Sequence, residues 1–421
     1  MKDEIVGRGS VGETTQRLVG VGWSSAVDAG QAGTEAGSAA LSTLGSSRKP
    51  GWALAFCGGR HDPETFLAAL RQELGDIPVA GGSAAGCITN ASLGYTGFEC
   101  AVAVFGTDLA RPRFILETGL DDKMKEVGTR LGRRLAREAT PGAVTLLFLD
   151  ALRFAGPPPQ PHVVSLLLDG MHAALESTAP VLIGAGTITD HQFRGGYIFD
   201  GNGVCRHAAL AIVLPPGISA CTDLSHGCAP ISGFHEITRA EGIVIHELDG
   251  RPTLEVLGSL GLKPALLPLH VGLSRKIGDP YGPDMESVFV NRLILSVDPE
   301  TRSVSLFEAD LKRGDWVQVM ARGNADMLAA THDATDRLIQ KADTVRPFFA
   351  LYVDCAGRAA SFCGSEAEEA AIVQATLGDS VPLLGCYTGV QIASITGRGQ
   401  SLNRAGVLTL LSAHENPHPR R

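Results

Sequence analysis

Short apolar segments alternate with amphipathic stretches along this chain. Continuously apolar segments occur at residues 52–56, 144–149 and 348–353, and their length and composition are typical of buried strands. In the stretch 61–74, apolar residues recur at helical spacing, and Asp62 suits the N-cap of the helix. Strands that alternate with helices in this way predict an α/β fold in which helices cover the sheets.

A glycine-rich segment closes each strand–helix unit. The three segments are IPVAGGSAAG at 77–86, APVLIGAGTITD at 179–190 and VPLLGCYTGVQ at 381–391. Each contains a proline, a short apolar run and then glycines, and such an echo indicates an internal strand–helix–strand repeat. We expect three glycine-rich turns at equivalent points of the repeats, and we expect a binding site at these turns.

Strand pairs joined by turns lie between the repeats. The segments 195–215 and 237–252 alternate in the manner of hairpins, so we predict mixed sheets in a layered α/β (α+β) fold. We also predict two related domains, at 18–217 and 218–412, because Pro215-Pro216-Gly217 closes the first half. The polar ends 1–17 and 413–421 are expected to be disordered.

The composition narrows the class of protein. The chain has 421 residues, of which 44% are hydrophobic and 19% charged, and a net charge of −9 gives little support for a nucleic-acid partner. No apolar run approaches the about 18 residues of a membrane-spanning helix, and the N-terminus has no signal-like apolar core. Nine cysteines without a CxxC pair indicate reduced thiols. We therefore expect a cytoplasmic protein that does not insert into a membrane.

The first glycine-rich segment supplies four candidate ligand-binding residues. Gly81 and Gly86 would let backbone N–H groups approach an anion such as a carboxylate, while Ser83 and Cys87 add polar side chains. The alternative is a tight turn between packed elements with no ligand.

The second segment contributes Gly184 and Asp190. The Asp190 carboxylate could hold a ligand ammonium group or orient His191 as an acid or base. An aspartate that accepts hydrogen bonds from its own turn is the alternative.

The third segment brings Cys386, Tyr387 and Gln391 together, and Asn403 follows on the next strand. These neutral donors and acceptors suit the orientation of a polar ligand inside an apolar pocket. In the alternative, they satisfy buried backbone groups.

Metal and haem sites have weaker support. Cys221, His226 and Cys228 lie within eight residues, but no second ligand pair accompanies them, so we predict no metal site. A haem needs an axial histidine on an apolar wall, for which His246 and His270 are candidates, yet the chain has no CxxCH motif. We expect no cofactor and keep haem as an alternative.

In this order, the segments resemble the FIST proteins, which consist of a FIST N-domain and a FIST C-domain. The resemblance rests on AFCGGRHDPETFLAALRQELGDIPVAGGSAAGCI, on VLIGAGTITDHQFRGGYIFDGNGVCRHAALAIVL and on ITRAEGIVIHELDGRPTLEVLGSLG. It is completed by VPLLGCYTGVQIASI together with Asn403. The chain departs from the family where a Gly-Glu pair is usual, because it has Gly86-Cys87 and Val390-Gln391 there, while Asp190 is retained.

The resemblance implies a sensory module that binds a small polar metabolite such as an amino acid. Such a protein would signal through a partner, for example a histidine kinase, and would more readily be a binding protein than an enzyme. Three alternatives stay open: a haem-binding nitric-oxide sensor, an enzyme with Cys87 or Cys386 as a reactive thiol, and a scaffold whose site has decayed.

Overall fold

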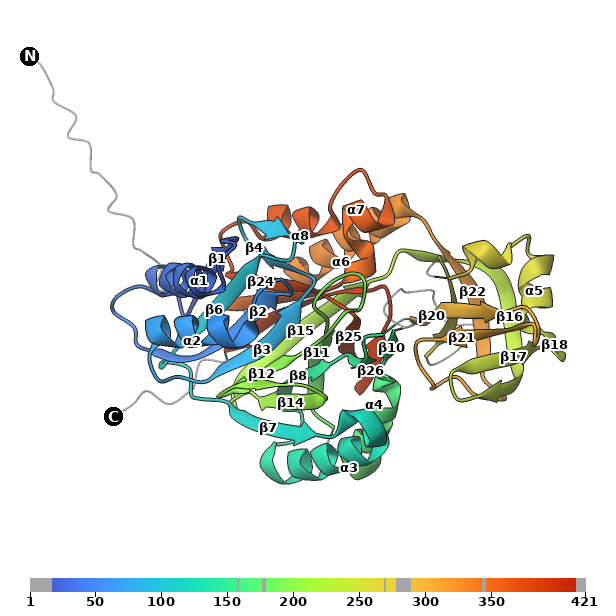
Figure 1. The fold of residues 1–421 in the computed structure, drawn as a ribbon, viewed down its shortest axis with the longest axis horizontal. Coiled ribbons are helices and arrows are strands. Elements are labelled where there is room, and N and C mark those ends of the chain that lie inside the picture. Colours follow the sequence, from blue (N-terminus) through green and yellow to red (C-terminus); the bar gives the residue numbers. More distant parts are fainter. Residues whose placement is uncertain are drawn as a thin grey trace, which may run out of the picture.

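The computed structural model describes residues 17–156, 159–175, 179–268, 270–277, 289–342 and 346–413. The two ends predicted to be disordered, 1–17 and 413–421, lie outside these residues apart from Arg17 and Ala413. Within the described part, three repeats of one α/β unit form the main body, and a further sheet is inserted into the third repeat (Figure 1).

Each repeat has two helices and four principal strands in the same order. The first repeat comprises β1 (Val19–Ser24), α1 (Ala29–Leu44), β2 (Pro50–Gly58), α2 (Pro63–Leu74), β3 (Val79–Ala84) and β6 (Cys100–Gly106). The second comprises β7 (Arg113–Thr118), α3 (Leu120–Glu138), β8 (Val144–Asp150), α4 (Val164–Leu175), β11 (Val181–Thr187) and β14 (Ala208–Val213). The third comprises β15 (Ile218–Ser225), α6 (Asn324–Ala342), β23 (Phe349–Cys355), α8 (Glu369–Leu377), β24 (Leu383–Thr388) and β27 (Gly406–Ala413).

Strand pairing is the same in the three repeats. The strands on either side of the second helix are parallel (β2–β3, β8–β11 and β23–β24), and the other principal strands pair antiparallel. The prediction of a layered α/β fold with mixed sheets is therefore confirmed. The boundary expected near Pro215 falls between β14 and β15, where the second repeat ends.

A cyclic exchange of strands joins the repeats. After its last parallel strand, each repeat crosses into the sheet of a neighbour: β4 (Gly86–Thr89) pairs with β24, β12 (Ile198–Gly201) with β3, and β25 (Val390–Ile395) with β11. Short strands extend these additions: β5 (Leu93–Gly94), β13 (Val204–Cys205) and β26 (Arg398–Leu402). Each six-stranded sheet is thus built from two repeats.

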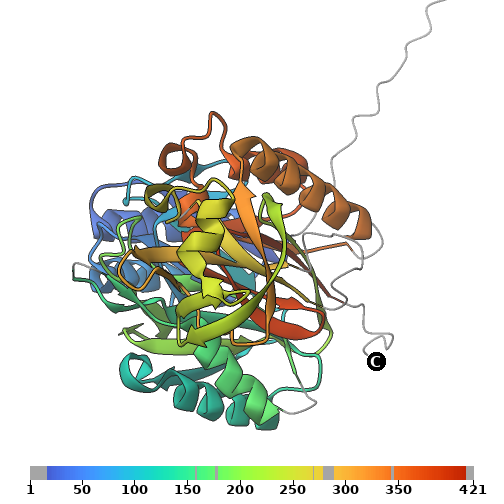
Figure 2. The same cartoon turned by 90° about the vertical axis from the view of Figure 1, so that its right-hand side faces the viewer.

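The helices lie outside the sheets, and the central apolar core lies between the inner faces of the sheets. In Figure 1, α1 and α2, α3 and α4, and α6 and α8 cover three different sides of the sheets, and Figure 2 agrees. On the inner faces, the ring of Phe56 lies 5.6 Å from that of Phe148, and the ring of Phe105 lies 5.0 Å from that of Phe349. The first repeat therefore packs on both others through one continuous apolar core.

The inserted sheet projects from the right-hand side of Figure 1. It consists of β16 (Cys228–Glu241), β17 (Val244–Leu248), β18 (Arg251–Pro252), β19 (Val271–Lys276), β20 (Phe289–Asp298), β21 (Ser303–Leu306) and β22 (Trp316–Arg322), with α5 (Thr253–Ser259). A separate cluster of buried apolar side chains, including Ile245, Leu273 and Val319, supports it.

Most of each glycine-rich segment lies in a strand, at Val79–Ala84, Val181–Thr187 and Leu383–Thr388, so the expectation of glycine-rich turns was wrong for these residues. Glycine is needed there because neighbouring parallel strands approach closely. A Cβ on Gly81 would lie 2.0 Å from the Ala55 carbonyl oxygen, and one on Gly184 would lie 1.8 Å from that of Leu147. The crossing into the neighbouring sheet follows each segment, so the segments are equivalent points of the repeats.

Candidate functional site

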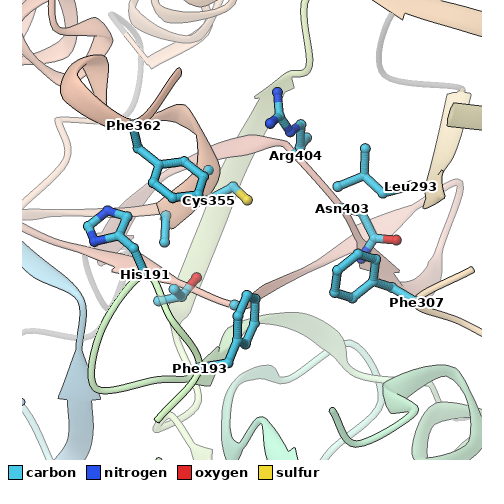
Figure 3. A pocket seen from close by; sticks show the side chains of 12 residues that line it. His191, Phe193, Leu293, Phe307, Cys355, Phe362, Asn403 and Arg404 are labelled. Atoms are coloured by element: carbon cyan, nitrogen blue, oxygen red, sulfur yellow. The ribbon is translucent and has the colours of Figure 1, made fainter. Parts of the chain in front are cut away.

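A cavity of about 40 Å³ lies beyond the carboxyl ends of β23 and β24 (Figure 3). The end of β23 contributes Cys355, and the residues between β24 and β25 contribute Gly389. The turn between β26 and β27 contributes Asn403 and Arg404. At this point β24 ends and the chain crosses to another sheet, and α/β proteins commonly bind ligands at such crossings.

Aromatic side chains from three separate elements surround this space (Figure 3). Phe193 follows β11, Phe362 belongs to the short helix α7 (Ala360–Cys363), and Phe307 follows β21 of the inserted sheet. The rings of Phe193 and Phe307 lie 6.3 Å apart. Leu293 of β20 adds a second apolar contact from the inserted sheet. The cavity is therefore formed jointly by the main body and the inserted sheet.

Three polar atoms at the cavity have no hydrogen-bond partner among the described residues. They are Nη1 of Arg404, Oδ1 of Asn403 and Nε2 of His191. The side chains of Arg404 and Asn403 are buried, since each residue is only 3% exposed. Because an unpaired buried polar atom costs about 1–3 kcal/mol, these atoms indicate a place for a polar ligand or for water.

Arg404 is a buried cation without a carboxylate. None of the ion pairs found over the described ranges includes it. Burial lowers its pKa to about 10, and the neighbouring guanidinium of Arg322 acts in the same direction. A buried guanidinium is normally paired, so an anionic group on a ligand would stabilise this one.

A buried ion pair fixes the turn that carries Asn403 and Arg404. Arg358 donates to both carboxylate oxygens of Glu369, at 2.7 and 2.8 Å, and to the backbone carbonyl oxygen of Arg404 at 2.8 Å. Arg358 and Glu369 are both fully buried. The backbone beneath the cavity is thus held by a charged network in the protein itself.

His191 stands between two aromatic rings. Its ring centroid lies 5.8 Å from that of Tyr95 and 5.2 Å from that of Phe362. Burial lowers the pKa of His191 below its ordinary value, so near neutral pH the ring is mainly uncharged. The ring can then either accept or donate one hydrogen bond at Nε2.

Concavities also lie at the equivalent points of the other two repeats, but different residues line them. Beyond β2, a concavity of about 620 Å³ is bordered by Arg60, Arg194 and Arg206. Beyond β8, a concavity of about 310 Å³ includes Asp150 and Arg206. The cavity of the third repeat differs in its aromatic lining, which the inserted sheet helps to supply.

Of the ten residues predicted to bind a ligand, Asn403 lines the cavity and Asp190 lies in the adjoining concavity beyond β2. Asp190 pairs with Arg194 at 2.8 Å and accepts a hydrogen bond from the backbone N–H of Gln192. Asp190 therefore makes the contacts expected of an aspartate that accepts hydrogen bonds from its own turn.

Among the side chains of the first and third segments, Ser83, Tyr387 and Gln391 have partners inside the protein. The Ser83 hydroxyl accepts from the Tyr197 N–H at 3.2 Å, and Tyr387 donates to Glu368 at 2.5 Å. Gln391 donates to the Thr388 hydroxyl at 3.1 Å and accepts from the Ala405 N–H at 3.3 Å.

The remaining predicted residues lie within the sheets. Gly86 and Cys87 of β4 pair with Tyr387 and Cys386 of β24, whereas Gly81 and Gly184 lie in β3 and β11. A ligand-binding role for these residues and for the three side chains with internal partners stays a prediction.

Several cavity residues were not among those predicted. The sequence indicates His191 only as a partner of Asp190, and Arg404 directly follows Asn403. Phe193, Phe307 and Phe362 carry no distinguishing local pattern. Their meeting depends on the crossing strands and on the position of the inserted sheet.

No group of three His, Cys, Asp or Glu side chains within the described ranges is arranged to hold a metal ion. At the Cys221–Cys228 segment, the backbone N–H of Cys228 donates to Nδ1 of His226 at 3.1 Å. No helix in the described part is long and apolar enough to cross a membrane.

Comparison with known proteins finds relatives that are themselves described as uncharacterized. A protein of Mycobacterium bovis and one of Mycobacterium tuberculosis, both called uncharacterized, are each 29% identical over 252 residues. These matches cover 58% of this chain and 62% of each relative, so the chain spans about three fifths of their length. A second M. tuberculosis protein is 26% identical over 249 residues, with 57% of this chain and 63% of that protein covered.

A solved chorismatase structure is similar at a TM-score of 0.34 and 9% identity, covering 94% of this chain and 99% of that one. A score this low supports no conclusion on function. The family comparison is decisive: the FIST N domain matches residues 51–251 and the FIST C domain matches residues 255–394. FIST domains occur in signal-transduction proteins. With most of its length matched, this chain belongs to the FIST family.

Proposed function

We propose that this protein is a sensor that binds a small carboxylate-bearing metabolite, such as an amino acid, in the cavity beyond β23 and β24. The observation that carries the proposal is Arg404, a buried guanidinium at an apolar cavity with no carboxylate partner among the described residues. A ligand carboxylate would supply the missing charge and accept from Nη1.

Asn403 and His191 would complete the recognition. The Asn403 Oδ1 atom can accept a hydrogen bond, and His191 Nε2 can take either role. Phe193, Phe307 and Leu293 would contact the apolar part of the ligand. Such a division between a few polar groups and an apolar wall is typical of small-molecule sites.

The inserted sheet would couple ligand binding to recognition by a signalling partner. Leu293 and Phe307 contact the cavity from the inserted sheet, whereas Arg404 belongs to the main body. A ligand touching both parts would stabilise their docked arrangement, which a cytoplasmic partner such as a histidine kinase could recognise.

The geometry favours this function over haem binding and thiol catalysis. A single buried water needs about 10–15 Å³ of cavity volume. The cavity of about 40 Å³ therefore has room for a small group and not for the macrocycle of haem. Burial raises the pKa of Cys87 and of Cys386 well above the ordinary value, which disfavours a thiolate nucleophile.

The test is a thermal-shift screen of the purified protein against amino acids, other small carboxylates and haemin. A ligand at 100 times its Kd should stabilise the protein by about 2.7 kcal/mol. We expect Arg404→Gln to lose this stabilisation, and Arg398→Gln, on an exposed residue of the preceding strand, to retain it. If no carboxylate shifts the melting temperature, or if Arg404→Gln responds like the parent, the proposal fails.

A further inference from the structure

A large concavity at the carboxyl ends of β2 and β3 is a second candidate site, separate from the cavity with Arg404. Its volume is about 620 Å³, and its wall includes Arg60, Arg194 and Arg206. We propose that this concavity binds a small anion with at least two negative charges, such as a phosphate ester or a polycarboxylate. The inference goes beyond the proposed function, because none of the three arginines lines the cavity with Arg404.

The concavity lies where α/β proteins commonly bind small molecules. Gly59 directly follows β2 and Ala85 directly follows β3, and both residues line the concavity. Other parts of its wall belong to residues that follow β11 of the second repeat. Two parallel neighbours, β2 and β3, thus end at this space, and the chain leaves β3 there for the sheet of the third repeat. A crevice at such a crossing is the usual position of a ligand site.

The wall of the concavity is cationic although the chain as a whole is acidic. The chain has 45 Asp and Glu residues against 36 Lys and Arg residues. Among the described residues that line the concavity, three are arginines and Asp190 is the one carboxylate. Asp190 pairs with Arg194 at 2.8 Å, so the charges of Arg60 and Arg206 are in excess. A concave wall with an excess of one charge raises the local concentration of ions of the opposite charge.

Aromatic rings, and not carboxylates, orient these two arginines. The guanidinium carbon of Arg60 lies 5.0 Å from the centroid of the Phe98 ring, and that of Arg206 lies 5.5 Å from the centroid of the Tyr197 ring. Nη1 of Arg206 also donates to the carbonyl oxygen of Gly196 at 3.0 Å. Over the described ranges, neither arginine takes part in an ion pair. Their other N–H groups can therefore donate to a ligand.

The carboxyl groups behind the wall are bound within the protein. Glu99 is only 4% exposed and accepts from two backbone N–H groups at 3.0 and 2.9 Å. Asp150 accepts from two backbone N–H groups at 2.9 and 3.0 Å, and burial raises its pKa despite the nearby Arg206. Glu368 accepts from two tyrosine hydroxyls. Each of these groups has its own donors, so the two guanidinium groups in excess stay available to a ligand.

Two uncompensated guanidinium groups favour a ligand with more than one negative charge. Arg60 belongs to the first repeat, and Arg206, between β13 and β14, belongs to the second. A guanidinium matches a carboxylate or a phosphate group, and one such group with a single charge balances one arginine. A multivalent anion balances both. The volume of about 620 Å³ has room for it, because one water needs about 10–15 Å³.

Calorimetric titration of the full-length protein tests the charge requirement. The probes are pyrophosphate, citrate and acetate, each at low and at physiological ionic strength. We expect pyrophosphate or citrate to bind, and the tighter of the two to show whether phosphate or carboxylate groups suit the site. Acetate should bind at least about tenfold more weakly than the tighter probe, a difference of about 1.4 kcal/mol. The affinity should fall as salt is added, because salt screens exposed charges.

Arginine variants locate the bound anion. Arg60→Gln and Arg206→Gln should each weaken the tighter probe at least about tenfold, and the melting temperature should stay nearly unchanged because both residues are exposed. Arg133→Gln is the matched control. It removes the same charge from an exposed residue of α3 outside the lining of the concavity, so binding should not change.

Several results would overturn the inference. One is that neither pyrophosphate nor citrate binds at low ionic strength, and another is that acetate binds as tightly as they do. If Arg206→Gln and Arg133→Gln affect binding equally, the anion binds elsewhere and the inference is wrong. If a single-stranded oligonucleotide binds more tightly than both probes and Arg206→Gln weakens it, the partner is a nucleic acid and not a small anion. None of these results bears on the carboxylate sensor, which the Arg404→Gln variant tests.

Discussion

Cys87 of β4 and Cys386 of β24 lie directly opposite each other in the antiparallel pair that joins the first repeat to the third. Both side chains are fully buried, and burial is the largest cause of their raised pKa values. The Cys87 thiol points at the backbone carbonyl oxygen of Glu99, 3.4 Å away. The two thiols therefore belong to the packed junction between repeats.

This arrangement predicts unreactive thiols. Treatment of the native protein with iodoacetamide near neutral pH should leave Cys87 and Cys386 unmodified, because neither the thiolate nor access is available. The half-buried Cys363 serves as the internal reference. Peptide mass spectrometry would measure the three sites, and faster labelling of Cys87 or Cys386 than of Cys363 would revive the thiol-enzyme alternative.

The ion pair beneath the cavity should be essential for stability. Glu369→Gln would leave the buried Arg358 guanidinium without its full counter-charge, at a cost of about 3–5 kcal/mol in the free energy of unfolding. Glu366→Gln, at an exposed residue of the same region, should change it by less than about 0.5 kcal/mol. Urea denaturation would compare the two, and equal midpoints would contradict the role of the pair.

Glu308 should make the stability depend on pH. It accepts from the Ser165 N–H at 2.7 Å, linking the inserted sheet to α4, and burial raises its pKa to about 7. In the unfolded chain a glutamate has a pKa of about 4.3, so the folded state binds this proton more tightly. The contribution of protonated Glu308 to the free energy of unfolding is therefore complete below about pH 4 and is lost as the pH rises to about 7.

Glu308→Gln would keep an acceptor for Ser165 and remove the titration. We expect the variant to gain stability relative to the parent as the pH rises from 4 to 8, by up to a few kcal/mol at about 1.4 kcal/mol per pKa unit. Denaturation at several pH values would measure the difference. A difference that is constant with pH would show that Glu308 does not titrate in this range.

The close approach of β8 and β11 should make Gly184 intolerant of a side chain. A Cβ there would lie 1.8 Å from the Leu147 carbonyl oxygen, so Gly184→Ala should cost about 3 kcal/mol or prevent folding. Gly203→Ala is the control, because a Cβ at Gly203 meets nothing within 4 Å. Thermal denaturation and soluble yield would distinguish them, and similar behaviour of both variants would count against the observed strand spacing.

Local features were predictable because they depend on neighbouring residues. Asp62 caps α2 as expected, accepting from the Thr65 N–H at 2.8 Å, and Pro63 occupies the first turn. The apolar segments 52–56 and 144–149 lie in the buried strands β2 and β8, and the segment 348–353 lies in β23 apart from its first residue. Local composition and the spacing of apolar side chains indicate such elements before their neighbours in the fold are known.

The glycine-rich segments show where prediction from sequence alone was incomplete. Their repetition revealed three equivalent units, yet local composition favours a turn wherever glycines cluster. Gly81 and Gly184 lie in strands because a parallel neighbour leaves no room for a Cβ, and that neighbour is distant in sequence.

The sequence by itself determined the order of strands and helices, the repeated unit and the family of this protein. Only the tertiary structure decided which strands cross between repeats and where the cavity lies. Phe193, Phe307 and Arg404 are separated by about a hundred residues each, and no local pattern relates them. They meet because the inserted sheet packs over the end of β24, a contact set by long-range burial of apolar surface.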